Sequence, residues 1–119
     1  MWKSKLKVKH IKDTKNPKRY LLIEPLIWED SEYRIEVPIG FETDFASIPK
    51  YLQWIIKPRG KHSKASVVHD FMYSVNWWSR TIADMTFYAI MLYDGVKKFI
   101  AYSFYKSVRI FGGSRYDTK

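Results

Sequence analysis

The chain has no cysteine among its 119 residues, which excludes several classes of site. Disulfide bonds, thiolate nucleophiles and cysteine-ligated zinc or iron–sulfur centres cannot form within it. Glycine and proline are scarce, with 5 of each, and no glycine-rich phosphate-binding loop occurs. No apolar run approaches the roughly 18 residues that a membrane-spanning helix needs. The first residues lack the apolar stretch of a secretory signal, so we expect a cytoplasmic protein.

The positive charge of the chain is concentrated near its N-terminus. The formal net charge is +9, and residues 1–19 hold eight lysines and arginines against one acid. The remaining residues are nearly balanced, with thirteen basic and eleven acidic side chains. Such a segment can attract nucleic acid, anionic lipid or an acidic protein, and it is equally typical of an edge strand whose lysines oppose aggregation. The candidate binding residues here are Lys3, Lys5, Lys7 and Lys9.

Hydrophobic patterning changes from strand-like to helix-like partway along the chain. Apolar residues that alternate with polar ones predict strands at residues 5–11 and 33–37, and the apolar, β-rich segment 20–28, which Pro25 interrupts, predicts another. Apolar residues at three- and four-residue spacing predict helices at residues 63–76, 81–93 and 96–110, and residues 50–57 can form a further short helix. Strands followed by helices indicate an α+β fold, in which a small N-terminal antiparallel β-meander precedes about three helices. We expect one domain over residues 1–119, with loosely held ends at 1–4 and 114–119.

Ionisable residues interrupt the apolar faces of two adjacent predicted helices. His69 and Tyr73 lie on the first helix, and Asp84 lies on the second. Burying such groups without partners costs several kcal/mol, so they should meet one another, a metal or a substrate. An imidazole oriented by a carboxylate can act as a base near neutral pH, which makes His69 and Asp84 a candidate catalytic pair with Tyr73 as support. Asp70 offers a hard oxygen ligand for a divalent cation.

Each of these residues also has a plain structural interpretation. A histidine on an apolar helix face is most often a core residue with satisfied hydrogen bonds, and Tyr73 fits an ordinary core position. The Thr81-x-x-Asp84 spacing resembles a capping box, in which Asp84 would accept hydrogen bonds from the backbone. Arg80 and Asp84 are also spaced as an i, i+4 ion pair on one helix. The pattern leaves both interpretations open.

A second polar group of residues lies between the predicted strands and helices. Thr43, Asp44 and Ser47 precede Pro49 in a predicted loop, where they can bind a metal or a substrate. Ser47 or Asp44 can instead cap a helix that begins near Pro49. Serine-based catalysis is disfavoured, because no serine lies in a Gly-x-Ser-x-Gly turn.

Trp77 and Trp78 lie between the two helices that carry the candidate site. Exposed tryptophans favour membrane or protein interfaces, and the alternative is that one or both of them pack into the core. Together with the N-terminal lysines, an exposed pair would suit an anionic phospholipid surface.

Three segments resemble a small family of phage and prophage proteins that is catalogued as a domain of unknown function. They are Gly40-Phe-Glu-Thr-Asp-Phe-Ala-Ser-Ile-Pro49, Val-Val-His69-Asp-Phe-Met-Tyr73 and Arg80-Thr-Ile-Ala-Asp84-Met-Thr-Phe87. The resemblance covers residues 38–112. It implies a phage origin and a location in the cytoplasm of an infected bacterium or in the virion, and it brings no established activity.

A shorter resemblance carries chemistry. His69-Asp70-x-x-Tyr73, followed by Asp84 on the next predicted helix, looks like the catalytic helix pair of the phospholipases A2. This likeness implies that His69 activates water, that Asp70 binds Ca²⁺, and that Asp84 and Tyr73 hold the imidazole. The glycine-rich calcium loop and the cysteines of that family are absent, and only the segment containing Asp44 stands upstream in a comparable place.

These observations lead to two main hypotheses. The first is a phage-related, metal-dependent hydrolase that cleaves an ester of an anionic phospholipid, with Ca²⁺ as its cofactor. The second is a non-catalytic phage accessory protein, structural or directed against a host factor, that binds an acidic partner through the basic N-terminus. Nucleic-acid binding through the same lysines is a third and weaker hypothesis.

Overall fold

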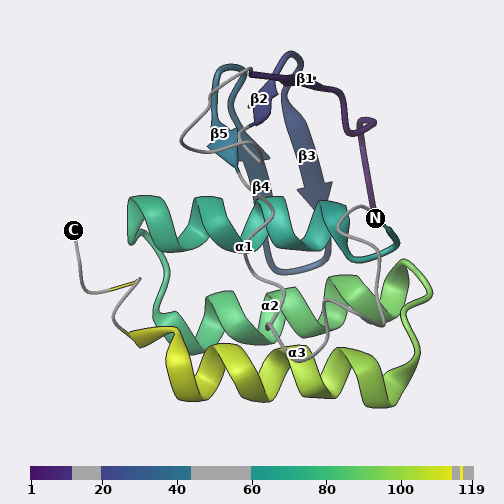
Figure 1. The fold of residues 1–119 in the computed structure, drawn as a ribbon, viewed down its shortest axis with the longest axis vertical. Coiled ribbons are helices and arrows are strands. Elements are labelled where there is room, and N and C mark those ends of the chain that lie inside the picture. Colours follow the sequence, from purple (N-terminus) through teal and green to yellow (C-terminus); the bar gives the residue numbers. More distant parts are fainter. Residues whose placement is uncertain (12–19, 44–59, 114–115, 117–119) are drawn as a thin grey trace. The chain divides into compact units, whose positions relative to one another are not determined.

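The computed structural model describes residues 1–11, 20–43, 60–113 and 116 (Figure 1). The chain divides into two compact units, Met1–Asp44 and Phe45–Lys119. The strands belong to the first unit and the helices to the second, which confirms the α+β class. The helix predicted at residues 50–57 lies outside the described residues, and so do Asp44, Ser47 and most of residues 114–119.

The first unit contains five short strands in two antiparallel sheets rather than one continuous meander. The strands are β1 (Val8–His10), β2 (Tyr20–Leu22), β3 (Leu26–Glu29), β4 (Arg34–Val37) and β5 (Glu42–Thr43). One sheet has the order β1-β2-β5, and the other pairs β3 with β4. The predicted strand 20–28 is divided between the sheets at Ile23–Pro25. Pro25 has no backbone N–H, and so it cannot donate to a sheet hydrogen bond at this position.

The β3–β4 pair shows the burial pattern that its sequence predicts. Leu26 and Trp28 of β3 and Ile35 and Val37 of β4 are buried, and the residues between them are more exposed. Asp30 stabilises the turn between the strands, because its Oδ1 accepts hydrogen bonds from the backbone N–H groups of Glu32 and Tyr33, each at 2.8 Å.

Residues 1–4, which we expected to be loosely held, are attached to β3. The backbone N–H of Lys3 donates to the carbonyl of Ile27 at 2.9 Å, and the Ser4 hydroxyl accepts from the N–H of Ile27 at 2.8 Å. The Trp2 ring meets the Trp28 ring edge to face, with centroids 5.0 Å apart. These contacts cover part of a strand that would otherwise present free backbone groups.

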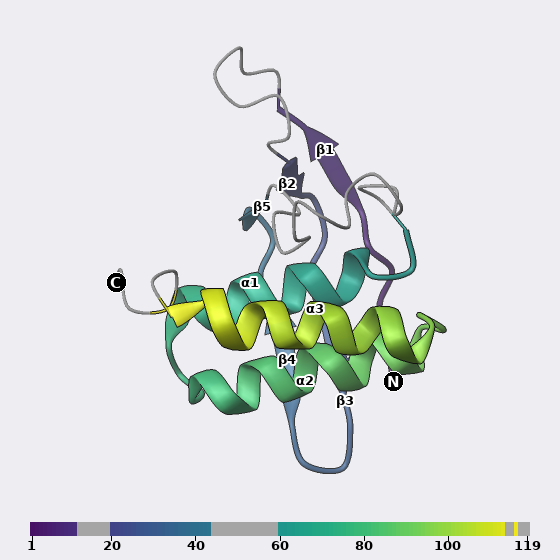
Figure 2. The ribbon, with the colours of Figure 1, turned by 60° about the horizontal axis from the view of Figure 1, so that its bottom comes forward.

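The second unit consists of three helices that run alongside one another (Figures 1 and 2). They are α1 (Ser63–Val75), α2 (Arg80–Tyr93) and α3 (Lys98–Phe111). The chain reverses direction through the short connections 76–79 and 94–97, and α2 packs against both α1 and α3. The boundaries predicted at residues 63–76, 81–93 and 96–110 lie within two residues of the observed ones. Within the described residues, none of the helices has the length and apolar composition required to cross a bilayer.

Local hydrogen bonds explain where these helices begin and end. The Ser79 hydroxyl accepts from the N–H of Ile82 at 3.1 Å and caps α2. Asn76 ends α1 in the left-handed conformation, with φ of 56°. A serine at the start of a helix is often its N-cap, but in α1 the N-cap position is His62, and the Ser63 hydroxyl accepts from the N–H of Gly60 at 2.8 Å.

Candidate functional site

Asp84 is the centre of a buried polar network that joins all three helices. Its side chain is 0% exposed. From α1, His69 Nε2 lies 2.7 Å from Asp84 Oδ1, and the Tyr73 hydroxyl donates to the same oxygen at 2.5 Å. From α3, Arg109 Nη1 donates to Asp84 Oδ2 at 2.8 Å. Both carboxylate oxygens are therefore occupied, and each neighbouring helix contributes to them.

Arg80 extends this network to the end of α3. Its Nε donates to the Tyr73 hydroxyl at 3.3 Å and lies 3.9 Å from Asp84 Oδ2. Its Nη2 donates to the carbonyl of Val108 at 2.7 Å and also to the carbonyl of Arg109. The last carbonyls of a helix have no partner within the helix, so Arg80 satisfies two of them from the start of α2.

The network favours an ionised Asp84 and a neutral Tyr73. Burial alone raises the pKa of Asp84, but hydrogen bonds from His69, Tyr73 and Arg109 outweigh it and hold that pKa below its ordinary value. Burial, together with the hydrogen bond to the Asp84 carboxylate, raises the pKa of Tyr73 far above its ordinary value. An ionised carboxylate can only accept hydrogen bonds, and so the proton shared with His69 resides on Nε2.

His69 is enclosed by aromatic rings. Its ring centroid lies 4.2 Å from that of Tyr73 and 4.6 Å from that of Phe87, and the side chain is 1% exposed. With the proton on Nε2, the lone pair of the ring is on Nδ1. Nδ1 is buried and has no hydrogen-bond partner among the residues that the structure describes. A buried ring nitrogen without a hydrogen-bond partner either lowers the stability of the fold or interacts with a ligand.

The structure confirms that His69, Tyr73 and Asp84 come together as predicted. The capping-box interpretation of Asp84 is wrong, because Ser79 caps α2 and the Asp84 oxygens bond to side chains. Sequence reasoning missed Arg109. A buried carboxylate usually has a cationic partner, so the sequence implies that a basic residue lies near Asp84, but it does not indicate which one.

A family model supplies the comparison with known proteins. The model described as "Protein of unknown function (DUF1353)" matches residues 20–108. The chain belongs to the DUF1353 family. Searches among curated proteins and among solved structures gave no match. Within this DUF1353 chain, the matched range contains His69, Tyr73 and Asp84, and it leaves out the lysines of residues 1–19.

The predicted metal ligands of this DUF1353 protein are placed only in part. Asp70 lies on α1 and is buried, with 9% of its side chain exposed, and Asp44 lies outside the described residues. Across residues 1–11, 20–43 and 60–113, no three histidine or acidic side chains are grouped as a metal site would require. Calcium binding through Asp70 and Asp44 stays a prediction.

The predicted surface residues of the DUF1353 protein are exposed to different degrees. Trp77 is 72% exposed and its ring contacts Phe71, whereas Trp78 is partly buried. Lys3, Lys5, Lys7 and Lys9 are all exposed. The Lys7 ammonium lies 3.2 Å from a Glu24 carboxylate oxygen. That these lysines and tryptophans bind a partner stays a prediction.

Proposed function

We propose that this protein is a hydrolase in which His69 activates a water molecule for attack on an ester. The observation that carries the proposal is the His69–Asp84 pair, because its hydrogen bond leaves the Nδ1 lone pair available as a base. The same pair, with Tyr73 on the same carboxylate, is what the resemblance to the phospholipases A2 implies. An anionic phospholipid is therefore the proposed substrate, and a phage or prophage the proposed origin.

In the proposed reaction His69 Nδ1 removes a proton from water while the water oxygen bonds to the ester carbonyl carbon. The carbon–oxygen bond to the leaving alcohol then breaks, and the imidazolium returns the proton to that oxygen. Asp84 accepts a hydrogen bond from the Nε2–H group and, as a carboxylate, stabilises the positive charge that the ring acquires. Tyr73 and Arg109 act as positioning residues, because they donate to the Asp84 carboxylate and neither forms a hydrogen bond with Nδ1.

Two features set conditions on this reaction. His69 is 1% exposed, so substrate must reach Nδ1 through a rearrangement of the residues around it. Calcium at Asp70 and Asp44 would polarise the ester carbonyl, and no step above depends on the ion. Assays with calcium and with a chelator therefore test the metal separately from the base.

The experiment measures fatty-acid release from phosphatidylglycerol vesicles by the wild type, His69→Gln and His10→Gln. His10 is an exposed histidine and serves as the matched control. Loss of a general base is expected to lower the rate by about 100-fold or more in His69→Gln and to leave His10→Gln unchanged. Melting temperatures of both variants show whether the loss follows unfolding. A wild type that releases no fatty acid, with or without calcium, would contradict the proposal.

The exposed lysines of the N-terminal segment favour a second candidate function, an accessory protein that binds an acidic partner. Lys3, Lys5 and Lys9 are exposed and form no ion pair with the residues that the structure describes. Replacing these three lysines with glutamine should weaken binding of polyglutamate, measured by fluorescence anisotropy. Replacing Lys61, Lys98 and Lys106 of the helical unit, which are exposed and carry the same total charge, is the control for net charge. Equal effects of the two sets would contradict a specific role for the N-terminal segment, and tighter binding of DNA than of polyglutamate would favour the nucleic-acid hypothesis.

A further inference from the structure

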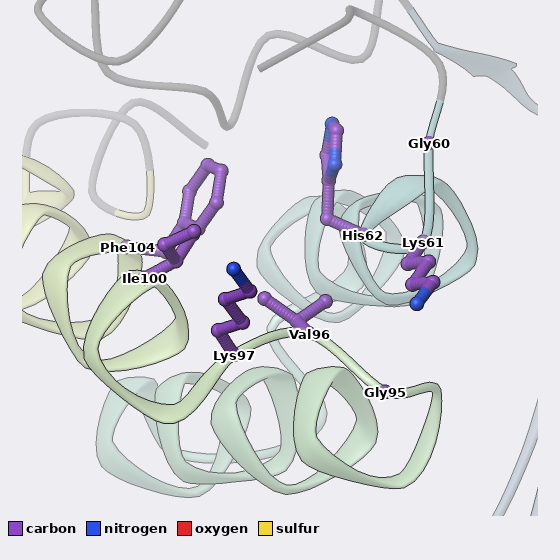
Figure 3. Close-up of a pocket in the computed structure, with 8 residues that line it drawn as sticks. All are labelled: Gly60, Lys61, His62, Gly95, Val96, Lys97, Ile100 and Phe104. Atoms are coloured by element: carbon purple, nitrogen blue, oxygen red, sulfur yellow. The ribbon is translucent and has the colours of Figure 1, made fainter. Parts of the chain in front are cut away.

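A small pocket lies where α1 and α3 begin, away from the Asp84 network (Figure 3). Its volume is about 230 Å³. Its walls are the segment that leads into α1, the connection between α2 and α3, and the first turns of α3. The lining residues are Gly60, Lys61, His62, Gly95, Val96, Lys97, Ile100 and Phe104.

The pocket is separate from the candidate catalytic histidine. His62 and His69 lie on the same face of α1, seven residues or about 10 Å apart along the helix axis. Phe87 and Phe104 pack between them, because Phe87 contacts His69, Phe104 contacts His62, and the two phenylalanine rings meet with centroids 6.1 Å apart. A ligand in the pocket would therefore not touch His69.

One side of the pocket is positively charged. Two lysines line it and no acidic residue does. Figure 3 shows the Lys97 side chain extending toward the space between Phe104 and His62, while Lys61 lies at the rim beside Gly95. Neither ammonium group has an ion pair or hydrogen bond with any residue in the described parts of the chain. Both would be available to an anion.

The helix starts add to this positive potential. Neither α1 nor α3 has a side-chain cap or an acidic residue in its first turn. The N-terminal end of a helix carries a partial positive charge, and here it is not offset by a carboxylate of its own helix.

The other side of the pocket is apolar. Val96, Ile100 and Phe104 form it, and the buried His62 ring stacks on Phe104 with centroids 5.4 Å apart and planes inclined by 22°. A hydrated inorganic ion would leave this surface uncovered. An aliphatic chain of a few carbons would bury it, which favours binding by about 0.8 kcal/mol for each methylene group.

We propose that this pocket binds a small amphiphilic anion, with its carboxylate near Lys97, its aliphatic chain on Phe104 and Ile100, and Lys61 adding positive potential at the rim. The pocket volume of about 230 Å³ leaves room for a carboxylate with a short aliphatic chain. This inference does not depend on the proposed hydrolase activity, since it rests on different residues.

Nuclear magnetic resonance of the histidine side chains tests the proposal directly. The chain has 3 histidines, so His62 provides a signal at the pocket and His10 an internal control. Hexanoate is the probe, with acetate as the anion without a chain and hexanol as the chain without an anion. We expect a saturable shift of the His62 signal with hexanoate and at least threefold weaker binding of acetate and hexanol. No saturable shift, or equal binding of hexanol, would overturn the proposal.

Matched variants separate specific binding from general attraction. Lys97→Gln should weaken hexanoate binding by about two- to fivefold, whereas Lys98→Gln, at an exposed neighbour outside the pocket, should not. Ile100→Trp should fill the pocket and abolish the His62 shift, and Ile110→Trp, at a position 65% exposed on the same helix, should preserve it. Equal effects of Lys97→Gln and Lys98→Gln, or hexanoate binding retained in Ile100→Trp, would refute the pocket as the site.

Discussion

The Asp84 carboxylate is removed from water and depends on its partners for stabilisation. Three donors from two other helices reach it, and Arg109 supplies a formal positive charge at 2.8 Å. A buried ion pair of this kind adds little net stability over an apolar core, but removing one partner leaves the other charge uncompensated. Residues of the network should therefore be sensitive to substitution whether or not His69 is catalytic.

Replacing Asp84 with asparagine tests this dependence. The substitution keeps the shape of the side chain and removes its charge, which leaves Arg109 and Arg80 without their carboxylate. We expect the free energy of unfolding to fall by about 3–5 kcal/mol, measured by urea denaturation. Glu24→Gln, which breaks an exposed ion pair with Lys7, is the control and should cost no more than about 1 kcal/mol. Similar losses in both variants would contradict the central role of Asp84.

Gly112 provides a second test at the scale of one residue. A Cβ added there would lie 2.7 Å from the Tyr73 hydroxyl oxygen and would also press on the carbonyl of Val108. Gly112→Ala should therefore displace Tyr73 and cost about 1–3 kcal/mol of stability. At Gly113 the same Cβ would meet only Arg80 side-chain atoms, at 3.6 Å or more, so Gly113→Ala should be nearly neutral.

A double variant identifies the cause of that loss. Tyr73→Phe removes the side-chain oxygen that lies 2.7 Å from the new methyl group and leaves the contact with the Val108 carbonyl in place. Gly112→Ala should thus cost less in the Tyr73→Phe background than in the wild type, as denaturation of all four proteins would show. An unchanged cost would assign the effect to the backbone of α3 instead.

At this scale the sequence predicts part of the site. His69, Tyr73 and Asp84 are recognisable because they are polar residues on otherwise apolar helix faces. Arg109 and Gly112 are not, because their importance arises only when α3 packs beside Asp84 and Tyr73. No local pattern in residues 96–113 indicates that contact.

Among the elements, the sequence predicts the observed helices more accurately than the observed strands. Three helices of 13 or 14 residues carry repeated apolar spacing and end at residues such as Asn76 and Gly95, which adopt positive φ. The strands have only 2 to 4 residues, so alternation locates β1 and β4 and does not fix the partners of any strand. The division of residues 20–28 between two sheets depends on Pro25 and on long-range pairing.

The cap of α2 is testable as an isolated element. Ser79→Ala removes the acceptor for the N–H of Ile82, and a lost N-cap costs about 1 kcal/mol. Ser103→Ala on α3 is the control, because its hydroxyl donates to the carbonyl of Phe99, a bond that supports no helix end. Thermal denaturation should show a lower melting temperature for Ser79→Ala alone. Equal melting temperatures of the two variants would contradict the capping role.

For the molecule as a whole, the Asp84 network makes stability depend on pH on both the acidic and the alkaline side. The pKa of Asp84 is lower in the folded state than in the unfolded state, so its contribution is complete above about pH 4 and is lost as the pH falls through the folded pKa. The pKa of Tyr73 is raised on folding, so its contribution is complete below about pH 10 and is lost above it. Each group changes the stability by up to about 1.4 kcal/mol per pH unit.

Denaturation across a pH series checks these signs. Asp84→Asn should flatten the acidic side of the stability profile, and Tyr73→Phe should flatten the alkaline side. Some acid dependence should persist in Asp84→Asn. Burial raises the pKa of Asp30 in the strand unit, but hydrogen bonds from Tyr33, Glu32 and Trp28 outweigh it and hold that pKa below its ordinary value. Parallel profiles for the wild type and Tyr73→Phe above pH 10 would show that Tyr73 is not the group that titrates.

The ion pair between Arg109 and Asp84 has a consequence for folding during synthesis on the ribosome. The two residues are 25 positions apart, so at 5–20 residues per second Arg109 is added roughly one to five seconds after Asp84. Until then the nascent hairpin of α1 and α2 holds a carboxylate with its nearest positive charge absent. The helical unit is therefore completed only after Arg109 has been added, and a chain that stops at Val108 should be digested by protease much faster than the chain of 119 residues.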